Sequence, residues 1–165
     1  MVEMHLAAVR VELPTNQPVL LLEEQGEAKR TLPILIGPAE AQAIAYALQG
    51  VVTPRPMTHD LLRDLLIDLG AIVDCVVITE LRDRTFYAEI RVTCNGRSHT
   101  VSARPSDAVA LAVRVEATIY ADDALVDAES YVIDTGDGDD HGQADELVSE
   151  FRQFIEGIKP EDFSG

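Results

Sequence analysis

The chain has 165 residues, of which 47% are hydrophobic and only 5% aromatic, as in a globular domain with an aliphatic core. The formal net charge is −16, and 14 of the 29 Asp and Glu residues lie in 121–165 beside only 2 of the 13 Lys and Arg residues. This acidic tail and the lack of a basic stripe argue against a polyanion such as nucleic acid as the ligand.

Two stretches of the chain carry the same order of elements, offset by 67 residues. Each stretch predicts a strand, then a β-hairpin, then a helix that starts at Pro38 or Pro105, where no N–H partner is needed. Apolar and polar residues alternate along the strands, and Asn95-Gly96 is typical of a tight hairpin turn. The expected strands are 4–12, 18–23, 30–36, 72–80, 86–92, 98–104 and 117–120, and the expected helices are 38–49, 59–69 and 105–115, with a helical turn in 122–132.

The segment between the two stretches has two features of its own. Pro54 and Pro56 predict an extended linker, after which Thr58 is expected to cap the helix 59–69. The leucines of that helix follow the spacing of one buried face; they are Leu61, Leu62, Leu65, Leu66 and Leu69. Farther along, the charged residues between 80 and 84 predict a solvated loop before the second hairpin.

These patterns predict an α+β fold in which duplicated strand–hairpin–helix units form a mixed or antiparallel sheet packed with helices. The compact domain is expected to span 1–132. Residues 133–143 are acidic and of low complexity, which is typical of a flexible linker. Residues 144–165 are expected to hold a C-terminal amphipathic helix and tail.

The segment after the prolines is the first candidate for chemistry. Phosphodiester hydrolysis needs charge neutralisation on the phosphate and an activated water. Arg55 and Thr58 can bind a phosphate, His59 can act as acid or base, and Asp60 can orient it. The structural alternative is a capped helix with Asp60 on its dipole and solvated Arg55 and His59.

The start of the helix at 105 is the second candidate. Arg104 and Ser106 can bind a phosphate at the helix N-terminus, beside Asp107. Glu40 occupies the matching position in the first stretch, so the two carboxylates can face each other across a cleft and hold a divalent metal. The structural alternatives are an Arg–Asp pair with capping, and two acids that lie far apart.

Four motifs in this order and spacing resemble the bifunctional nuclease family; they are LPILIGPAEA at 32–41, PRPMTHDL at 54–61, TFYA at 85–88 and ARPSDAVA at 103–110. The resemblance covers about residues 1–130. It implies hydrolysis of both DNA and RNA with little sequence selectivity, although the site residues above rest on their own chemistry.

Two functions therefore stay open. The first is a nuclease that uses His59, Asp60, Asp107 and Glu40, with Mg²⁺ or Mn²⁺ on Glu40 and Asp107. The second is a non-catalytic oligomeric module that engages a protein or small ligand. In both cases we expect a homodimer that covers sheet edges. Without an apolar run of about 18 residues we expect no membrane segment, and we expect a cytoplasmic protein.

Overall fold

The computed structural model describes residues 1–12 and 14–132. In chain order the elements are β1 (Val2–Glu12), β2 (Gln17–Glu24), β3 (Arg30–Leu35), α1 (Pro38–Leu48), α2 (Thr58–Asp68), β4 (Ala71–Arg82), β5 (Thr85–Cys94), β6 (Arg97–Ala103), α3 (Pro105–Val115), β7 (Thr118–Ala121), α4 (Asp123–Glu129) and β8 (Tyr131–Val132). The expected elements of this part are confirmed within a few residues. The expected linker and C-terminal helix lie outside the described residues.

All eight strands form one mixed sheet in the order β6-β5-β4-β7-β1-β2-β3-β8. It combines two antiparallel meanders, β1–β2–β3 and β4–β5–β6, each followed in sequence by a helix that starts at a proline. The short strand β7 joins them, pairing antiparallel with β1 and parallel with β4. The fold is therefore α+β with a mixed sheet, as the sequence indicates.

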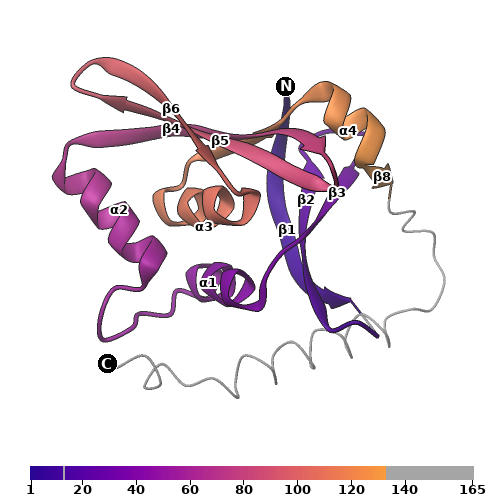
Figure 1. Cartoon of the computed structure of the whole chain (residues 1–165), viewed down its shortest axis with the longest axis horizontal. Helices are drawn as coiled ribbons and strands as arrows, with labels where there is room; N and C mark the ends of the chain where they lie inside the picture. The colour runs from indigo at the N-terminus through magenta and orange to yellow at the C-terminus, as the bar shows by residue number, and fades with distance from the viewer. Residues whose placement is uncertain (13, 133–165) are drawn as a thin grey trace.

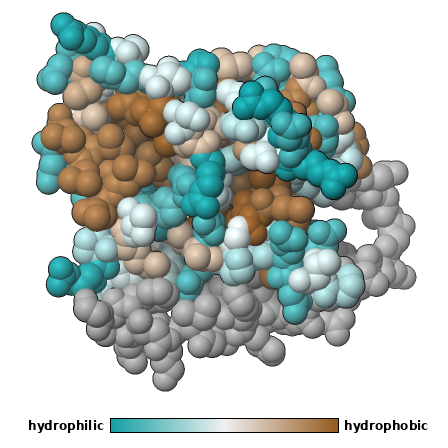
Figure 2. All heavy atoms as spheres, viewed as in Figure 1, coloured by the Kyte–Doolittle hydropathy of each residue, from teal (hydrophilic) through white to brown (hydrophobic). Residues whose placement is uncertain are grey.

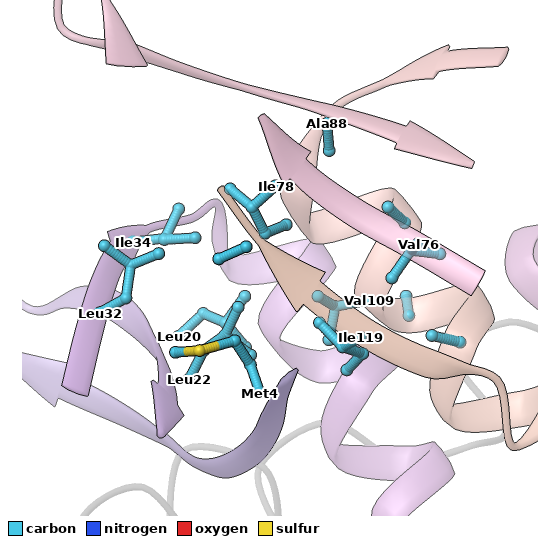
Figure 3. Close-up of a cluster of buried hydrophobic side chains, with 14 of the residues drawn as sticks. Met4, Leu20, Leu22, Leu32, Ile34, Val76, Ile78, Ala88, Val109 and Ile119 are labelled. Atoms are coloured by element: carbon cyan, nitrogen blue, oxygen red, sulfur yellow. The ribbon is translucent and has the colours of Figure 1, made fainter. Parts of the chain in front are cut away.

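The curved sheet folds around α1 and α3, and α2 lies beside α3 at the end of the layer (Figure 1). The core forms where aliphatic side chains of both meanders meet the alanine-rich face of α3. Figure 3 shows this cluster, with Leu20, Leu22 and Ile34 from one meander and Val76 and Ile78 from the other. Small alanines on α3, which are buried completely, allow the helix to approach the sheet closely.

Three details differ from the sequence-based expectations. Met57, not Thr58, is the N-cap of α2, because the Asp60 carboxylate accepts the Met57 N–H and closes the first turn. The charged residues at 80–82 belong to β4, and only Asp83 and Arg84 form the turn, with left-handed φ values of 51° and 61°. A two-residue turn of this kind matches the twist of the strands it connects.

The third difference concerns the leucines of α2. Only Leu62 and Leu66 pack against the core, whereas Leu61, Leu65 and Leu69 are at least half exposed. The apolar stripe of this helix is therefore wider than the surface it covers. Within residues 1–12 and 14–132, no helix is long and apolar enough to cross a membrane.

Candidate functional site

Four ionisable side chains form a connected group, which we call the charged cluster: Glu40 of α1, His59 of α2, Asp107 of α3 and Arg104, the N-cap residue of α3. The Arg104 guanidinium donates to both oxygens of Asp107, from Nε to Oδ2 at 2.6 Å and from Nη2 to Oδ1 at 3.0 Å. Its Nη1 lies 2.9 Å from Glu40 Oε1. His59 Nε2 lies 3.0 Å from Asp107 Oδ1. Arg104 thus joins the carboxylates of α1 and α3, and Asp107 joins α3 to α2.

The local sequence explains why the two carboxylates meet. Glu40 and Asp107 each follow an N-terminal proline by two residues, in the first turn of α1 and α3, where the helix dipole favours a negative charge. Gly37 caps α1, and a Cβ at that position would overlap the Glu40 carboxylate. The absence of a side chain at Gly37 therefore lets Glu40 fold back towards Arg104.

Hydrogen bonding fixes the protonation pattern of the pair His59–Asp107. Burial by itself raises the pKa of Asp107, but hydrogen bonds from Arg104 and then His59 outweigh it and hold the pKa below its ordinary value of 3.8. The ionised carboxylate only accepts hydrogen bonds, so Nε2 of His59 carries a proton. In the neutral tautomer with this proton, Nδ1 has a lone pair that can accept another. This is how a carboxylate orients a histidine that exchanges protons.

Arg104 keeps donors free while it holds both carboxylates. Hydrogen bonds to Asp107, and secondarily to Glu40, raise the pKa of Arg104 above its ordinary value, so the guanidinium stays charged. A guanidinium has five N–H donors, and the contacts to Asp107 and Glu40 use three of them. The side chain is 65% exposed, so the remaining donors are within reach of an anion in solution.

Asp60 takes a different role from the one its sequence position suggests. Its carboxylate lies 2.6 Å from Nε of Arg114, whose side chain is only 4% exposed, and also accepts the Met57 N–H. Arg114 further donates to the carbonyls of Ala110 and Ala43, so one guanidinium ties α3 to α1 and α2. The sequence analysis did not single out Arg114, although it is the only charged residue of α3 after the first turn.

The other candidates, Arg55, Thr58 and Ser106, form no side-chain hydrogen bond or ion pair with the charged cluster within residues 1–12 and 14–132. Arg55 and Thr58 are exposed, and neither side chain bonds to the cluster within the described part of the chain. Ser106 is buried at the start of α3. It lines a groove of about 1570 Å³ together with Gly37, Pro38 and Arg104. Arg104 thus belongs to both the cluster and the groove.

Glu40 and Asp107, the expected metal ligands, lie close together because the Arg104 guanidinium pairs with both of them. Among residues 1–12 and 14–132, no three His, Cys, Asp or Glu side chains are arranged to hold a metal ion. In this arrangement the residues do not fit a divalent cation unless Arg104 moves away.

Acidification is expected to lower the stability of the fold. The pKa of Asp60 is below its ordinary value because hydrogen bonds from Arg114 and the Met57 N–H outweigh the opposing effect of burial, and the pKa of Asp107 is also lowered. A carboxyl group whose pKa is lower in the folded state stabilises the fold above its unfolded-state pKa of about 3.9 and loses this effect as the pH falls through the folded-state value.

The measurement is the urea midpoint of unfolding at about pH 6 and about pH 3, for the wild type and Asp60→Asn. The wild-type midpoint should be lower at the acidic pH, and the variant should show a smaller drop. An equal drop in both proteins would contradict the role given to Asp60.

Comparison with known proteins agrees with the motifs. Two uncharacterized proteins of Mycobacterium tuberculosis, MT1877 and Rv1829, are each 43% identical over 164 residues, covering 98% of this chain and 97% of theirs. Bifunctional nuclease 2 of Oryza sativa subsp. japonica is 27% identical over 106 residues, which are 62% of this chain and 33% of that protein. The family model of the bifunctional nuclease domain matches residues 19–134, which include the whole charged cluster, and the chain belongs to this family.

Proposed function

We propose that this protein hydrolyses phosphodiester bonds of DNA and RNA with little sequence selectivity. The observation that carries the proposal is the charged cluster, in which an oriented histidine and an exposed arginine share the Asp107 carboxylate. The membership of the bifunctional nuclease domain family supports the same activity. The rice relative is named a bifunctional nuclease, and the match covers 33% of that protein.

The chemistry assigned to each residue follows from its contacts. Hydrolysis forms a bond between a water oxygen and phosphorus and breaks the bond to a sugar oxygen, which leaves with a proton. Nδ1 of His59 accepts the proton from water and returns it to the leaving oxygen, while Asp107 holds the ring. The free N–H donors of Arg104 bind the phosphate oxygens, where charge develops. Because water, not a ribose hydroxyl, is the nucleophile, the same steps apply to DNA and RNA.

The test is cleavage of end-labelled single-stranded DNA and RNA by the purified full chain, with Mg²⁺, Mn²⁺ or EDTA. Arg104→Ala should lower the cleavage rate by about 10²-fold or more, as loss of a preorganised donor does. Arg97→Ala removes an exposed arginine of β6 outside the cluster and should leave the rate unchanged. Equal rates in the wild type and Arg104→Ala, or no cleavage under any condition, would reject the proposal.

The metal dependence belongs to the same proposal. We expect Mg²⁺ or Mn²⁺ to be held by Glu40 and Asp107 only if the incoming phosphate draws Arg104 away from them. Activity that survives EDTA would leave the metal-free assignment of His59 and Arg104 in place. Activity that EDTA abolishes and Mn²⁺ restores would favour the two carboxylates as ligands.

A second candidate is an oligomeric binding module, and one observation favours the oligomer. Apolar side chains gather over the end of the molecule where α2 lies (Figure 2). Leu61, Leu65 and Leu69 of this helix are 50%, 51% and 69% exposed, and Val101 of the edge strand β6 is 51% exposed. We propose that a second copy of the chain covers this surface as a homodimer. If light scattering shows that the wild-type protein is a monomer, the homodimer is rejected.

The order of elements also supports an internal duplication. We propose that β1–β2–β3–α1 and β4–β5–β6–α3 descend from one ancestral unit, since both are meanders followed by a helix with an acid in its first turn. The symmetric placement of Glu40 and Asp107 around Arg104 is then a consequence of the duplication, while the arginine itself occurs in the second unit only.

A further inference from the structure

The groove beside the charged cluster is too large for a small-molecule pocket. Its volume is about 1570 Å³, and pockets for small molecules hold about 300–1,000 Å³. Its walls come from the end of β1, from β2 and β3, from the β4–β5 turn and from the first residues of α1 and α3. The size suits a segment of a polymer.

Three arginines from three separate elements line this groove. Arg10 comes from β1, Arg84 from the tip of the β4–β5 hairpin, and Arg104 from the N-cap of α3. Arg84 and Arg10 are exposed, and neither has an ion-pair or hydrogen-bond partner among residues 1–12 and 14–132. The left-handed φ of 61° at Arg84 belongs to a tight turn that fixes where this side chain starts. Unpaired guanidinium groups are suited to phosphates.

The groove is less acidic than the domain as a whole. Residues 1–132 carry 11 Lys or Arg and 19 Asp or Glu. The groove lining includes three arginines and two acids, Glu12 and Glu129. Because Arg104 is paired with two carboxylates, the arginines of the groove that are unpaired within the described part of the chain are Arg10 and Arg84. Two unpaired guanidinium groups on an acidic protein favour an anion at this surface. The overall acidity therefore does not exclude a polyanionic ligand, and it limits where one can bind.

The floor of the groove is apolar and partly exposed. Val19 pairs with Leu35 and Leu21 with Pro33 across β2 and β3, and all four line the groove. Leu35 is 56% exposed, so part of this floor is open to a ligand. Apolar surface beside arginines fits a ligand that is charged along one side and flat and apolar along the other.

Two aromatic side chains add stacking surfaces to this floor. Phe86 lies next to the β4–β5 turn and Tyr131, which is 46% exposed, lies at the β8 end of the groove. Aromatic rings and arginine planes stack on nucleobases of any sequence. In a duplex the base faces are stacked on one another and only phosphates and base edges reach the surface, so the apolar floor would have no partner.

We propose that this groove binds a single strand of DNA or RNA, with its phosphates on Arg10 and Arg84, its bases on the apolar floor, and the scissile phosphate led to Arg104. The inference rests on the proposed nuclease function and names the form of its substrate.

The test is fluorescence anisotropy of the full chain in EDTA with labelled single strands of about 12 nucleotides, as oligo-dT and oligo-U, and with a duplex of equal length. The single strands should bind more tightly than the duplex. Arg10→Ala and Arg84→Ala should each weaken binding and lower the slope of log affinity against log salt by about 0.7. Tyr131→Leu, which keeps apolar area but removes the ring, should weaken binding by about 5- to 100-fold.

The matched control is Arg97→Ala, an exposed arginine of β6 outside the groove. It should leave affinity and salt slope unchanged, and urea unfolding checks that every variant is folded. Equal loss in Arg97→Ala, a duplex bound as tightly as the single strand, or unchanged binding in Arg10→Ala and Arg84→Ala would overturn the inference.

The inference and the proposed function fail in different ways. If the wild type binds single strands without cleaving them, and Arg10→Ala and Arg84→Ala lose this binding, the groove is supported and the nuclease function is rejected. Cleavage that depends on Arg104 but has the same KM in Arg10→Ala, Arg84→Ala and wild type would keep the nuclease and reject the groove.

Discussion

Replacing His59 by alanine is expected to lower the rate of phosphodiester cleavage by about 10²- to 10⁴-fold, the usual contribution of a positioned acid or base. The reason is the contact between Nε2 and Asp107 Oδ1, which leaves Nδ1 as the group that exchanges a proton with substrate or water. The measurement is the rate at which single-stranded DNA and RNA are cleaved at several pH values. The wild-type rate should change with pH because the reaction needs a group that exchanges a proton, and His59→Ala should lose this dependence.

Two further variants separate catalysis from folding, because His59 is only 8% exposed and its removal leaves a gap. Asp107→Asn keeps a hydrogen-bonding group beside the ring but removes the charge that orients it, so kcat should fall while KM changes little. His99→Ala alters an exposed histidine of β6 and should keep the wild-type rate and pH profile. If His59→Ala keeps the wild-type pH profile while folded, the histidine is a structural residue.

Replacing Arg114 by methionine is expected to reduce the free energy of unfolding by about 3–5 kcal/mol, the cost of leaving a partly buried charge without its partner. Arg114 is 4% exposed, its partner Asp60 is 23% exposed, and the guanidinium also satisfies two helix carbonyls. Methionine fills a similar length without a charge, so the loss reports the ion pair and its hydrogen bonds. Urea unfolding at neutral pH measures it.

The control compares the Arg114–Asp60 ion pair with an exposed ion pair on α2. Arg63 of α2 pairs with its neighbour Asp64, and both are more than a third exposed. Arg63→Met should therefore change the free energy of unfolding by about 0–1 kcal/mol. The double variant Asp60→Asn with Arg114→Met should recover part of the loss, because asparagine still accepts the Met57 N–H without a charge. Equal effects of Arg63→Met and Arg114→Met would contradict this account.

The candidate site could be predicted in part from neighbouring residues. Arg104, Asp107 and Glu40 were found because prolines fix the helix starts and place an acid in each first turn. His59 was found from its motif, but its contact with Asp107 spans 48 residues of sequence and depends on how α2 lies against α3. Asp60 is adjacent to His59 in sequence yet points to Arg114, since a helix turns successive side chains to different sides.

The groove could not be predicted from the sequence. Arg10, Arg84 and Arg104 are far apart in the chain, and only Arg104 stands in a motif that suggests phosphate binding. They line one surface because β7 inserts between β1 and β4, pairing parallel with one meander and antiparallel with the other. A four-residue strand gives little local signal of its partners, so the joining of the two meanders was not expected.

The sequence by itself determined the helices and strands, because their signals are local and depend on neighbouring residues. These signals are the alternation along strands, asparagine–glycine at a turn and prolines at helix starts; the acidic C-terminal part is likewise a local feature. Only the tertiary structure decided which carboxylate meets which arginine, that Arg114 is buried, and that arginines distant in sequence line one groove. Those properties depend on packing between residues distant in sequence, where burial strengthens a charge pair and exposure weakens it.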